Sequence, residues 1–388
     1  MKKKPSRTPK PRKLAIPDCK HFTGYKPCFP ETNCLEECVD PQPRGTNILI
    51  INLEAMGNVL VTTTLLPAIK RKYPKSAVSW ITLRNAYRLL DHNPYLDKAY
   101  VWEPESLLQL GSMQFDVVMN IDKAANSCAL AMSLKAKKKF GYGLNKNGVI
   151  VPINKEAGYN YRLGLDDNLK FRINQKPNTQ LLTEAMGLNY VRDEYVLRLT
   201  AEEEAFSAAY RQSLKLKPSD LVAGLNTGCS LLYPNKKMTV DQHVVLINEL
   251  SKKEGVKVVL LGGTEDTERN AEIYRQVGDK VVSTPTTEGL RRGICYENIC
   301  DVVVSGDSFG MHVAIGLRKH VIVWFGVSCP QEIDLFDRGV KFIPEGLACS
   351  PCWKKECPYD LECAQLIDLE GIVQQVERFR ESIRRQSI

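Results

Sequence analysis

The chain has 388 residues, of which 43% are apolar and 25% are charged, and this composition is typical of a soluble globular protein. Its length allows two α/β domains of ordinary size with a small appendage. The sequence has no run of about 18 uncharged apolar residues, and its first residues lack the apolar core of a secretory signal. These features argue against a membrane-spanning or secreted protein, and we expect a cytoplasmic location.

The formal net charge of +8 is concentrated at the N-terminus. Residues 1–13 contain seven Lys or Arg residues and no acid, so the rest of the chain carries 8 − 7 = +1. Three prolines in the same stretch disfavour a helix, and residues 1–18 are expected to form a basic, disordered tail. Its charges predict no more than a weak peripheral contact with anionic lipid at the inner face of the cytoplasmic membrane.

Residues 19–44 form a cysteine-rich segment. The spacing C-x8-C-x5-C-x3-C is similar to that of CCCH zinc fingers, with a cysteine at the histidine position. So short a segment has little core of its own and needs a metal ion to fold. Structural zinc is therefore one interpretation, and four free thiols in a loop are the other. The four candidate ligands are Cys19, Cys28, Cys34 and Cys38.

Residues 45–210 predict a first α/β domain. Its first strand (48–52) is an apolar, β-branched run without polar alternation, as expected of a parallel strand covered on both faces. A loop through Gly57 and a helix follow. The stretch 139–164 is rich in Gly, Asn and Tyr, and it predicts a loop with short strands. Further strands are expected at 77–83, 98–103 and 115–122.

Residues 211–370 predict a second α/β domain, and we place the boundary within 200–218, where a charged helix gives way to Pro-Ser-Asp. A closing amphipathic helix within 371–388 is expected to pack back across the first domain. Two successive strand–helix series predict two Rossmann-like, doubly wound domains that face a cleft. Strands are expected at 221–228, 256–263, 300–306 and 321–326, and helices at 239–255, 267–278 and 309–317.

Three loops of the second domain carry residues suited to a nucleotide. Small residues let a diphosphate approach the backbone, and the free N–H groups of a following helix supply donors. A lysine adds a compact positive charge, and a carboxylate past a strand end can accept ribose hydroxyls. Taken singly, each loop also fits an ordinary helix start. The candidates are Thr227, Gly228, Lys236, Gly263, Glu265, Asp307, Ser308, Gly310 and His312.

Together these segments resemble glycosyltransferase family 9, the heptosyltransferases that use ADP-heptose to build the inner core of lipopolysaccharide. The resemblance runs from about Asn47 to Ile367, through NILIINLEAMGN, GLNTGCSLLYPNKKM, VVLLGGTED and DVVVSGDSFGMH, in the order found in the family. It implies the GT-B fold, an inverting mechanism without a cofactor, and a nucleotide sugar held mainly by the C-terminal domain. The acceptor implied is a lipopolysaccharide core or a related saccharide or glycolipid.

The same resemblance assigns roles to single residues. Asp307, Ser308 and His312 match the positions that surround the diphosphate and the sugar. Lys236 matches the lysine that neutralises the diphosphate, and Glu265 matches a carboxylate that binds the ribose.

The first glycine loop departs from the family pattern. Where the family has Gly-Asp, with the aspartate as the expected general base, this chain has Gly57-Asn58. An amide has no basic lone pair at neutral pH, so Asn58 can orient the acceptor hydroxyl but cannot deprotonate it. A base relocated to Glu54 or Asp122, a slow enzyme, and a binding protein descended from an enzyme are the three explanations.

A second group of four cysteines lies near the C-terminus. The segment CSPCWKKECPYDLEC has the spacing C-x2-C-x4-C-x5-C, close to that of a zinc knuckle. Four thiolates suit a tetrahedral zinc ion or an iron–sulfur cluster, and we interpret the group as structural. The ligands would be Cys349, Cys352, Cys357 and Cys363.

Two other functions remain open at this point. One is a nucleic-acid-binding module, in which a CCCH-like finger and a basic arm are fused to an inactive transferase scaffold. Readers of single-stranded RNA need exposed aromatic rings, and only Phe22, Tyr25 and Phe29 are available, so nucleic acid is the less favoured partner. The other is a sugar-nucleotide epimerase of the same fold, which the order of the segments disfavours.

Overall fold

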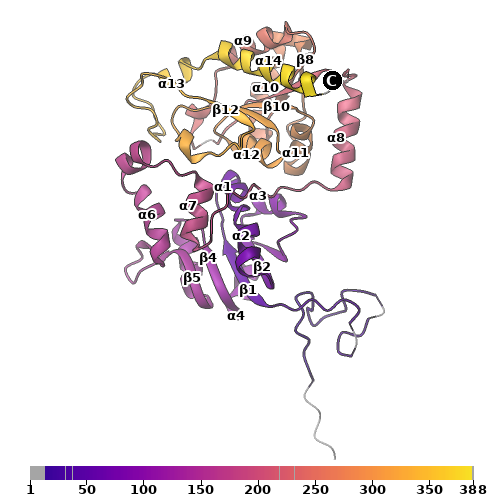
Figure 1. The fold of residues 1–388 in the computed structure, drawn as a ribbon, viewed down its shortest axis with the longest axis vertical. Helices are drawn as coiled ribbons and strands as arrows, with labels where there is room; N and C mark the ends of the chain where they lie inside the picture. Colours follow the sequence, from indigo (N-terminus) through magenta and orange to yellow (C-terminus); the bar gives the residue numbers. More distant parts are fainter. Residues whose placement is uncertain (1–13, 31, 37, 218, 231, 387–388) are drawn as a thin grey trace, which may run out of the picture.

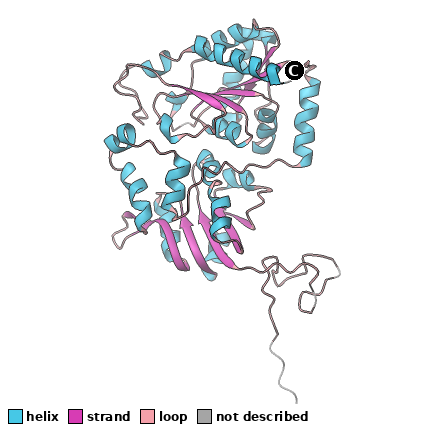
Figure 2. Cartoon of the chain, viewed as in Figure 1, coloured by secondary structure: helices cyan, strands magenta, loops and turns pink. Residues whose placement is uncertain are grey.

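Two six-stranded sheets, one in each half of the chain, organise the fold (Figure 1). The computed structural model describes residues 14–30, 32–36, 38–217, 219–230 and 232–386. Most of the predicted basic tail, residues 1–13, lies outside these ranges. Helices cover the sheets in both halves, and the predicted α/β class is confirmed (Figure 2).

The N-terminal sheet has the strand order β3-β2-β1-β4-β5-β6. Its strands are parallel except for the antiparallel pair β5–β6. The central strand β1 forms where the sequence has its apolar, β-branched run, and its last four residues are fully buried. The strands are β1 (Thr46–Ile51), β2 (Ser76–Thr82), β3 (Lys98–Val101), β4 (Gln114–Asn120), β5 (Lys135–Leu144) and β6 (Ile150–Pro152).

Strand β5 is longer than the sequence suggests. We expected only short strands after residue 139, yet β5 has ten residues and pairs with β4 along most of its length. Its sequence, KAKKKFGYGL, is dominated by Lys and Gly, which are depleted in strands, and pairing with β4 overrides that local preference. The helices of this half are α1 (Met56–Thr62), α2 (Leu65–Lys72), α3 (Arg84–Tyr87), α4 (Pro104–Ser112), α5 (Ala125–Ser133), α6 (Gly158–Leu163) and α7 (Asn178–Ala185).

The C-terminal sheet has the order β12-β11-β10-β7-β8-β9, and all its strands are parallel. Numbered within its own half, this is the strand order of a dinucleotide-binding Rossmann domain. The strands are β7 (Leu221–Asn226), β8 (Val256–Leu261), β9 (Val281–Ser283), β10 (Val302–Gly306), β11 (His320–Trp324) and β12 (Gly339–Phe342). The helices are α8 (Ala201–Ser213), α9 (Val240–Ser251), α10 (Thr267–Val277), α11 (Leu290–Asn298), α12 (Phe309–Gly316), α13 (Glu362–Gln365) and α14 (Leu369–Gln386).

Helix α8 shows where the two halves meet in sequence. The expected division between residues 210 and 211 falls inside this helix, which packs against α11 of the C-terminal half. The hydroxyl of Ser207 donates to the carbonyl of Cys295 at 3.0 Å, and Arg211 pairs with Asp301 at 2.9 Å. The whole of α8 therefore belongs structurally with the C-terminal sheet, and the connecting segment is 189–200.

The closing helix α14 corrects another expectation. We expected it to cross back to the first domain, but it packs on α9 beside the C-terminal sheet (Figure 1). Ile372, Val373 and Val376 are buried among side chains of that sheet, and Phe379 stacks on His320 with the ring centroids 4.0 Å apart. The buried part of its apolar stripe is therefore covered by its own domain and not by the first.

The two halves share one apolar interface. Helix α1 packs against α12, and the connecting residues Tyr195 and Leu197 are buried in the same cluster.

The described residues of 14–44 contain no helix or strand, and Lys20 ties them to the N-terminal sheet by an ion pair with Asp97 at 2.7 Å. Among the helices of the described ranges, none combines the length and apolarity needed to cross a bilayer.

Candidate active site

Each sheet has a topological switch point, where the strand order reverses and ligands bind in doubly wound folds. In the N-terminal sheet it lies between β1 and β4, and in the C-terminal sheet between β7 and β10. An asparagine bridges each one. The amide of Asn52 donates to Oδ1 of Asp122 at 2.6 Å, and the amide of Asn226 donates to Oγ of Ser305 at 3.0 Å. The two halves thus place matching polar loops at their carboxyl edges.

The C-terminal switch point forms a polar cradle. The Asn226 amide also donates to Oγ of Ser308 at 2.8 Å and to the carbonyl of Gly228 at 3.2 Å. Ser308 precedes α12, but within the described structure its hydroxyl makes no capping bond to that helix. The first N–H groups of α12 are therefore not used by Ser308 and suit an anionic group. A small pocket opens beside this cradle, and its lining includes Asn226, Thr227, Gly228, Lys236, Ser305 and Gly306.

Lys236 and Asp307 form a buried ion pair in this site. Nζ of Lys236 lies 2.7 Å from Oδ2 of Asp307, and their side chains are only 12% and 10% exposed. Burial alone would raise the pKa of Asp307, but the Lys236 ammonium, together with His312 and the Ser328 hydroxyl, holds that pKa below its usual value. The predicted diphosphate lysine is therefore in direct contact with Asp307, one of the residues predicted to surround the diphosphate and the sugar.

Three glycines of the site stand where a side chain would collide. A Cβ at Gly228 would lie 2.1 Å from the Asp266 carboxylate, and one at Gly310 would lie 2.6 Å from the Asn226 amide. A Cβ at Gly57 would lie 2.6 Å from Cδ2 of His312. This last contact joins the two halves, because Gly57 lies in the first turn of α1 and His312 belongs to α12. The expected loop through Gly57 is therefore wrong, since the helix already begins at Met56.

His312 is neutral in this environment. Burial lowers its pKa to about 4, although the Asp307 carboxylate opposes the shift. Its Nδ1 lies 3.1 Å from the hydroxyl of Tyr195, and the two rings stack with centroids 5.9 Å apart. Tyr195 lies in the connecting segment, and no motif in the sequence marked it as part of the site.

The remaining predicted donor residues occupy different surroundings. The Thr227 side chain is buried and its hydroxyl donates to Oδ1 of Asn270 at 2.5 Å, so only its backbone is available to a ligand. Gly263 and Glu265 are exposed just past β8. The buried carboxylate of that loop is Asp266, which accepts from the Gly263 N–H at 3.0 Å and lies 3.7 Å from Nζ of Lys237. Asp266 therefore holds the loop, while Glu265 is left free to meet solvent or ligand.

On the N-terminal side, the three catalytic candidates differ in exposure. Asn58 and Glu54 are exposed, whereas Asp122 is partly buried. The Asp122 carboxylate accepts hydrogen bonds from the Asn52 amide and the Leu53 N–H. Burial nevertheless raises the pKa of Asp122 to about 7, and the negative charge of Glu54 adds to the increase. β1 and β4 are neighbours, as expected, so Glu54 and Asp122 follow adjacent strand ends.

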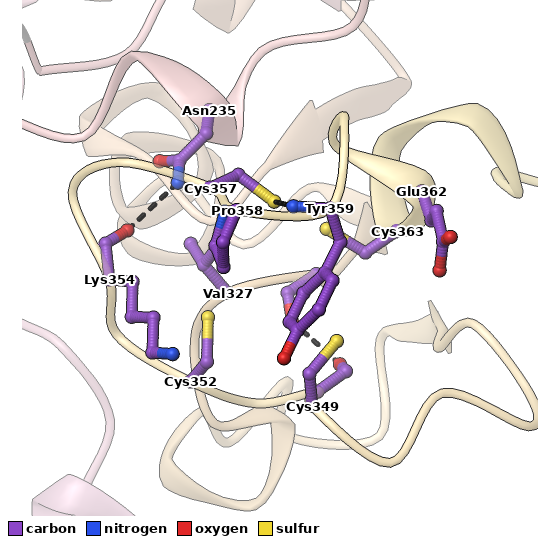
Figure 3. Close-up of a pocket in the computed structure, with 12 residues that line it drawn as sticks. Asn235, Val327, Cys349, Cys352, Lys354, Cys357, Pro358, Tyr359, Glu362 and Cys363 are labelled. Carbon is purple, nitrogen blue, oxygen red and sulfur yellow. Dashed lines mark hydrogen bonds between the residues drawn. The ribbon is translucent and has the colours of Figure 1, made fainter.

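The two cysteine groups are arranged differently from one another. In the N-terminal segment, Cys19 is buried while Cys28 is exposed. In the C-terminal segment, Cys349, Cys352, Cys357 and Cys363 line one pocket (Figure 3). In neither segment does the described structure group three or more His, Cys, Asp or Glu side chains so as to hold a metal ion. The structure therefore does not support the two metal centres, which stay predictions.

Three further charged or aromatic residues make contacts between the two halves near this site, and the sequence did not identify them. Lys170 lies 3.9 Å from the buried carboxylate of Glu332, whose pKa is raised by burial. Trp353, from the second cysteine segment, lies with its ring centroid 4.3 Å from Nζ of Lys236. In the sequence, only the Trp followed by two Lys residues in the CSPCWKKEC segment indicated that this segment contributes to the site.

Comparison with known proteins shows which family this chain resembles. The family model for glycosyltransferase family 9 (heptosyltransferase) matches residues 107–362. The lipopolysaccharide core heptosyltransferase OpsX of Haemophilus influenzae is 30% identical over 104 residues, which span 25% of this chain and 30% of that relative.

Solved structures share the architecture. A family 9 glycosyltransferase from Veillonella parvula superposes with a TM-score of 0.67 at 16% identity, covering 87% of this chain and 98% of the other. The ADP-heptose lipopolysaccharide heptosyltransferase II of E. coli gives 0.66 at 15% identity, covering 87% and 100%. These likenesses confirm the predicted GT-B fold of two Rossmann-like domains. Since the family model also covers well over half of its length, the chain belongs to glycosyltransferase family 9 (heptosyltransferase).

Proposed function

We propose that the protein transfers a heptose or a similar sugar from a nucleotide sugar such as ADP-heptose to a lipopolysaccharide core or a related glycan acceptor, with inversion at the anomeric carbon. Membership of the family supports this proposal. So do the names of two similar proteins, one an ADP-heptose heptosyltransferase and one a lipopolysaccharide core heptosyltransferase.

The observation that carries the proposal is the buried pair of Lys236 and Asp307 at the start of α12. A diphosphate leaving group gains negative charge as the glycosidic bond breaks, and a fixed ammonium in a water-poor site stabilises that charge. The Asp307 carboxylate suits hydroxyl groups of the sugar, and the first N–H groups of α12 suit the phosphate oxygens. The donor would thus lie on the C-terminal half.

We assign the general base to Asp122 and an orienting role to Asn58. A base works best when its pKa is close to the working pH, and the pKa of Asp122 is about 7. Asn58 is exposed in the first turn of helix α1, next to Gly57, which meets His312, so its amide suits a hydrogen bond to the acceptor hydroxyl. The acceptor would then approach from the N-terminal half.

A polar contact with the membrane belongs to the same proposal. If the acceptor is a glycolipid, it is held in a bilayer, and the basic residues 1–13 would favour anionic headgroups. Vesicles with and without anionic lipid would test this by co-sedimentation.

The direct experiment is to incubate the protein with ADP-heptose, UDP-glucose and GDP-mannose and to measure thermal unfolding. A ligand that binds the folded state stabilises it in proportion to RT ln(1 + [L]/Kd), so the donor should raise the unfolding temperature most. Transfer to a heptose-deficient core saccharide, with the anomeric configuration read by NMR, then tests inversion. Absence of stabilisation by any nucleotide sugar would contradict the proposal.

Asn58 also supports a second candidate, a family member that binds but does not catalyse. Asn58→Asp distinguishes the two. A modest change in activity fits a base relocated to Asp122, whereas activity that appears only in the variant shows that the native protein is a binding protein.

A further inference from the structure

Trp353 joins the second cysteine segment to the proposed donor site. The ring centroid lies 4.3 Å from Nζ of Lys236 and 4.7 Å from Nζ of Lys170. Lys236 lies in the short 3-10 turn η4 (Pro234–Lys236) of the C-terminal half, and Lys170 lies in η3 (Leu169–Ile173) of the N-terminal half. One indole ring thus contacts an ammonium group from each domain.

The geometry around Lys236 is that of a desolvated cation–π contact. An ammonium within about 6 Å of a ring centroid is attracted by the negative face of the ring, and more strongly where water is excluded. Only 12% of the Lys236 side chain is exposed. Its ammonium therefore lies between the Asp307 carboxylate and the Trp353 ring, and Tyr233 stands edge-on to that ring at a centroid distance of 5.2 Å.

Both domains hold the backbone that carries Trp353. Its own N–H donates to the carbonyl of Val327, after β11, at 2.8 Å. The Asn235 amide, next to Lys236, donates to the carbonyl of Lys354 at 2.9 Å (Figure 3). From the N-terminal half, Arg172 donates to the carbonyl of Ala348 at 2.7 Å. The ring is therefore held on a segment that is tied to both halves of the molecule.

We propose that Trp353 is a positioning residue for Lys236. Trp353 keeps the diphosphate-binding ammonium in place, and through its contact with Lys170 it fixes the position of one domain relative to the other. The proposal rests on the proposed function, because Lys236 is taken to meet the donor diphosphate. A lysine stem has several rotatable bonds, and fixing it before the ligand arrives removes an ordering cost from binding. The π face of residue 353, and not its volume alone, is what this role requires.

The test uses the full-length protein and ADP as the probe, with the Kd measured by calorimetry. Trp353→Leu removes the π face and keeps an apolar side chain, and we expect the Kd for ADP to rise about 5- to 30-fold. Trp353→Phe keeps a ring face and should restore binding to within about 3-fold of wild type. The matched control is Tyr359→Ala, which removes an exposed ring of the same segment and should leave binding unchanged. In donor kinetics, Trp353→Leu should raise KM more than it lowers kcat.

A double-mutant cycle separates positioning from simple packing. In a Lys236→Ala background, Trp353→Leu should cause little further loss of ADP binding, because both act through one ammonium. Equal binding by Trp353→Leu and wild type, or fully additive losses, would overturn the inference.

A fluorescence measurement keeps the test decisive if Trp353→Leu does not fold. The chain has four tryptophans, and subtracting the Trp353→Phe signal isolates residue 353. ADP should change that emission, and an unchanged signal while ADP binds would also overturn the inference. Wild-type protein that does not bind ADP at all would contradict the proposed function instead.

Discussion

At the scale of single residues, burial decides how the charged groups of the donor site act. Lys236 and Asp307 are both largely removed from water, so each charge needs the other as a partner. A charged hydrogen bond contributes about 1.5 to 3 kcal/mol, more than most exposed pairs. Low exposure makes the ion pair costly to break. It also strengthens the attraction between the ammonium and a diphosphate, because little water screens the charges.

Lys236→Ala is therefore expected to weaken donor binding and to slow transfer, by about 10- to 100-fold in kcat/KM. Steady-state kinetics with ADP-heptose measures the loss. Lys253→Ala is the control, because Lys253 pairs with Glu377 on the outer surface of the same half and should behave like wild type. Unchanged kinetics for Lys236→Ala would refute the assignment of the diphosphate lysine.

Asp122 gives a prediction for pH dependence. A general base must be deprotonated, and since the pKa of Asp122 is raised to about 7, the rate should fall as the pH drops below about 7. Asp122→Asn should lower kcat by about 10² to 10⁴ and remove this acid limb from the pH profile. Glu54→Gln is the comparison, because Glu54 is exposed on the same face and should retain activity. If Glu54→Gln is the inactive variant, the base is Glu54.

At the scale of elements, helix α14 stabilises the C-terminal domain rather than joining the two domains. Ile372 is fully buried against that sheet. Ile372→Ala should lower the free energy of unfolding by about 2 to 5 kcal/mol, through lost burial and the cavity left behind. Arg378→Ala, at an exposed position of the same helix, should change it by less than about 0.5 kcal/mol. Urea unfolding of both variants measures the difference. If Ile372→Ala were as stable as Arg378→Ala, α14 would not stabilise the domain as proposed.

The cysteine segments give an elemental prediction. The sequence predicts zinc or iron at about two equivalents per chain in protein purified without added metal, one for each four-cysteine group. The group at 349–363 already lines one pocket, so its sulfurs would need to draw together on binding. Cys352→Ser should lower the metal content by about one equivalent. Finding neither metal, with all thirteen thiols free to react in native protein, would exclude both sites.

At the scale of the whole molecule, apolar packing rather than surface charge joins the two halves. Arg192 pairs with Asp334 at 2.8 Å and with Asp337 at 2.7 Å, but the Arg192 side chain is 45% exposed and that of Asp337 82%, and exposed ion pairs contribute little. Tyr195, three residues later, is buried in the shared cluster and contacts His312. The connecting segment therefore contributes mainly through the residues that it buries.

A paired comparison tests this division. Arg192→Ala should change the free energy of unfolding by less than about 1 kcal/mol, whereas Tyr195→Ala should cost about 3 to 5 kcal/mol. Thermal or urea unfolding of the two variants provides the measurement. Equal losses would mean that the ion pairs, and not the buried ring, hold the halves together.

The sequence by itself determined the fold class and the order of the loops. Buried parallel strands leave continuous apolar runs, and the loops after them carry glycine, hydroxyl and lysine side chains in the chain order of the family, so both were readable locally. The sequence did not determine β5 correctly, because its Lys and Gly residues disfavour a strand that pairing with β4 nonetheless forms. It also could not show which domain the amphipathic α14 would cover.

Only the tertiary structure decided which residues share a site. Gly57 meets His312, and Trp353 meets Lys170 and Lys236, across sequence separations that no local pattern encodes. It also showed that Asp122 lies at a switch point with a pKa near 7, whereas Glu54 at the neighbouring strand end is exposed. Burial and charge at a site depend on every element packed around it, and for that reason they follow from the folded chain and not from the motifs that first marked it.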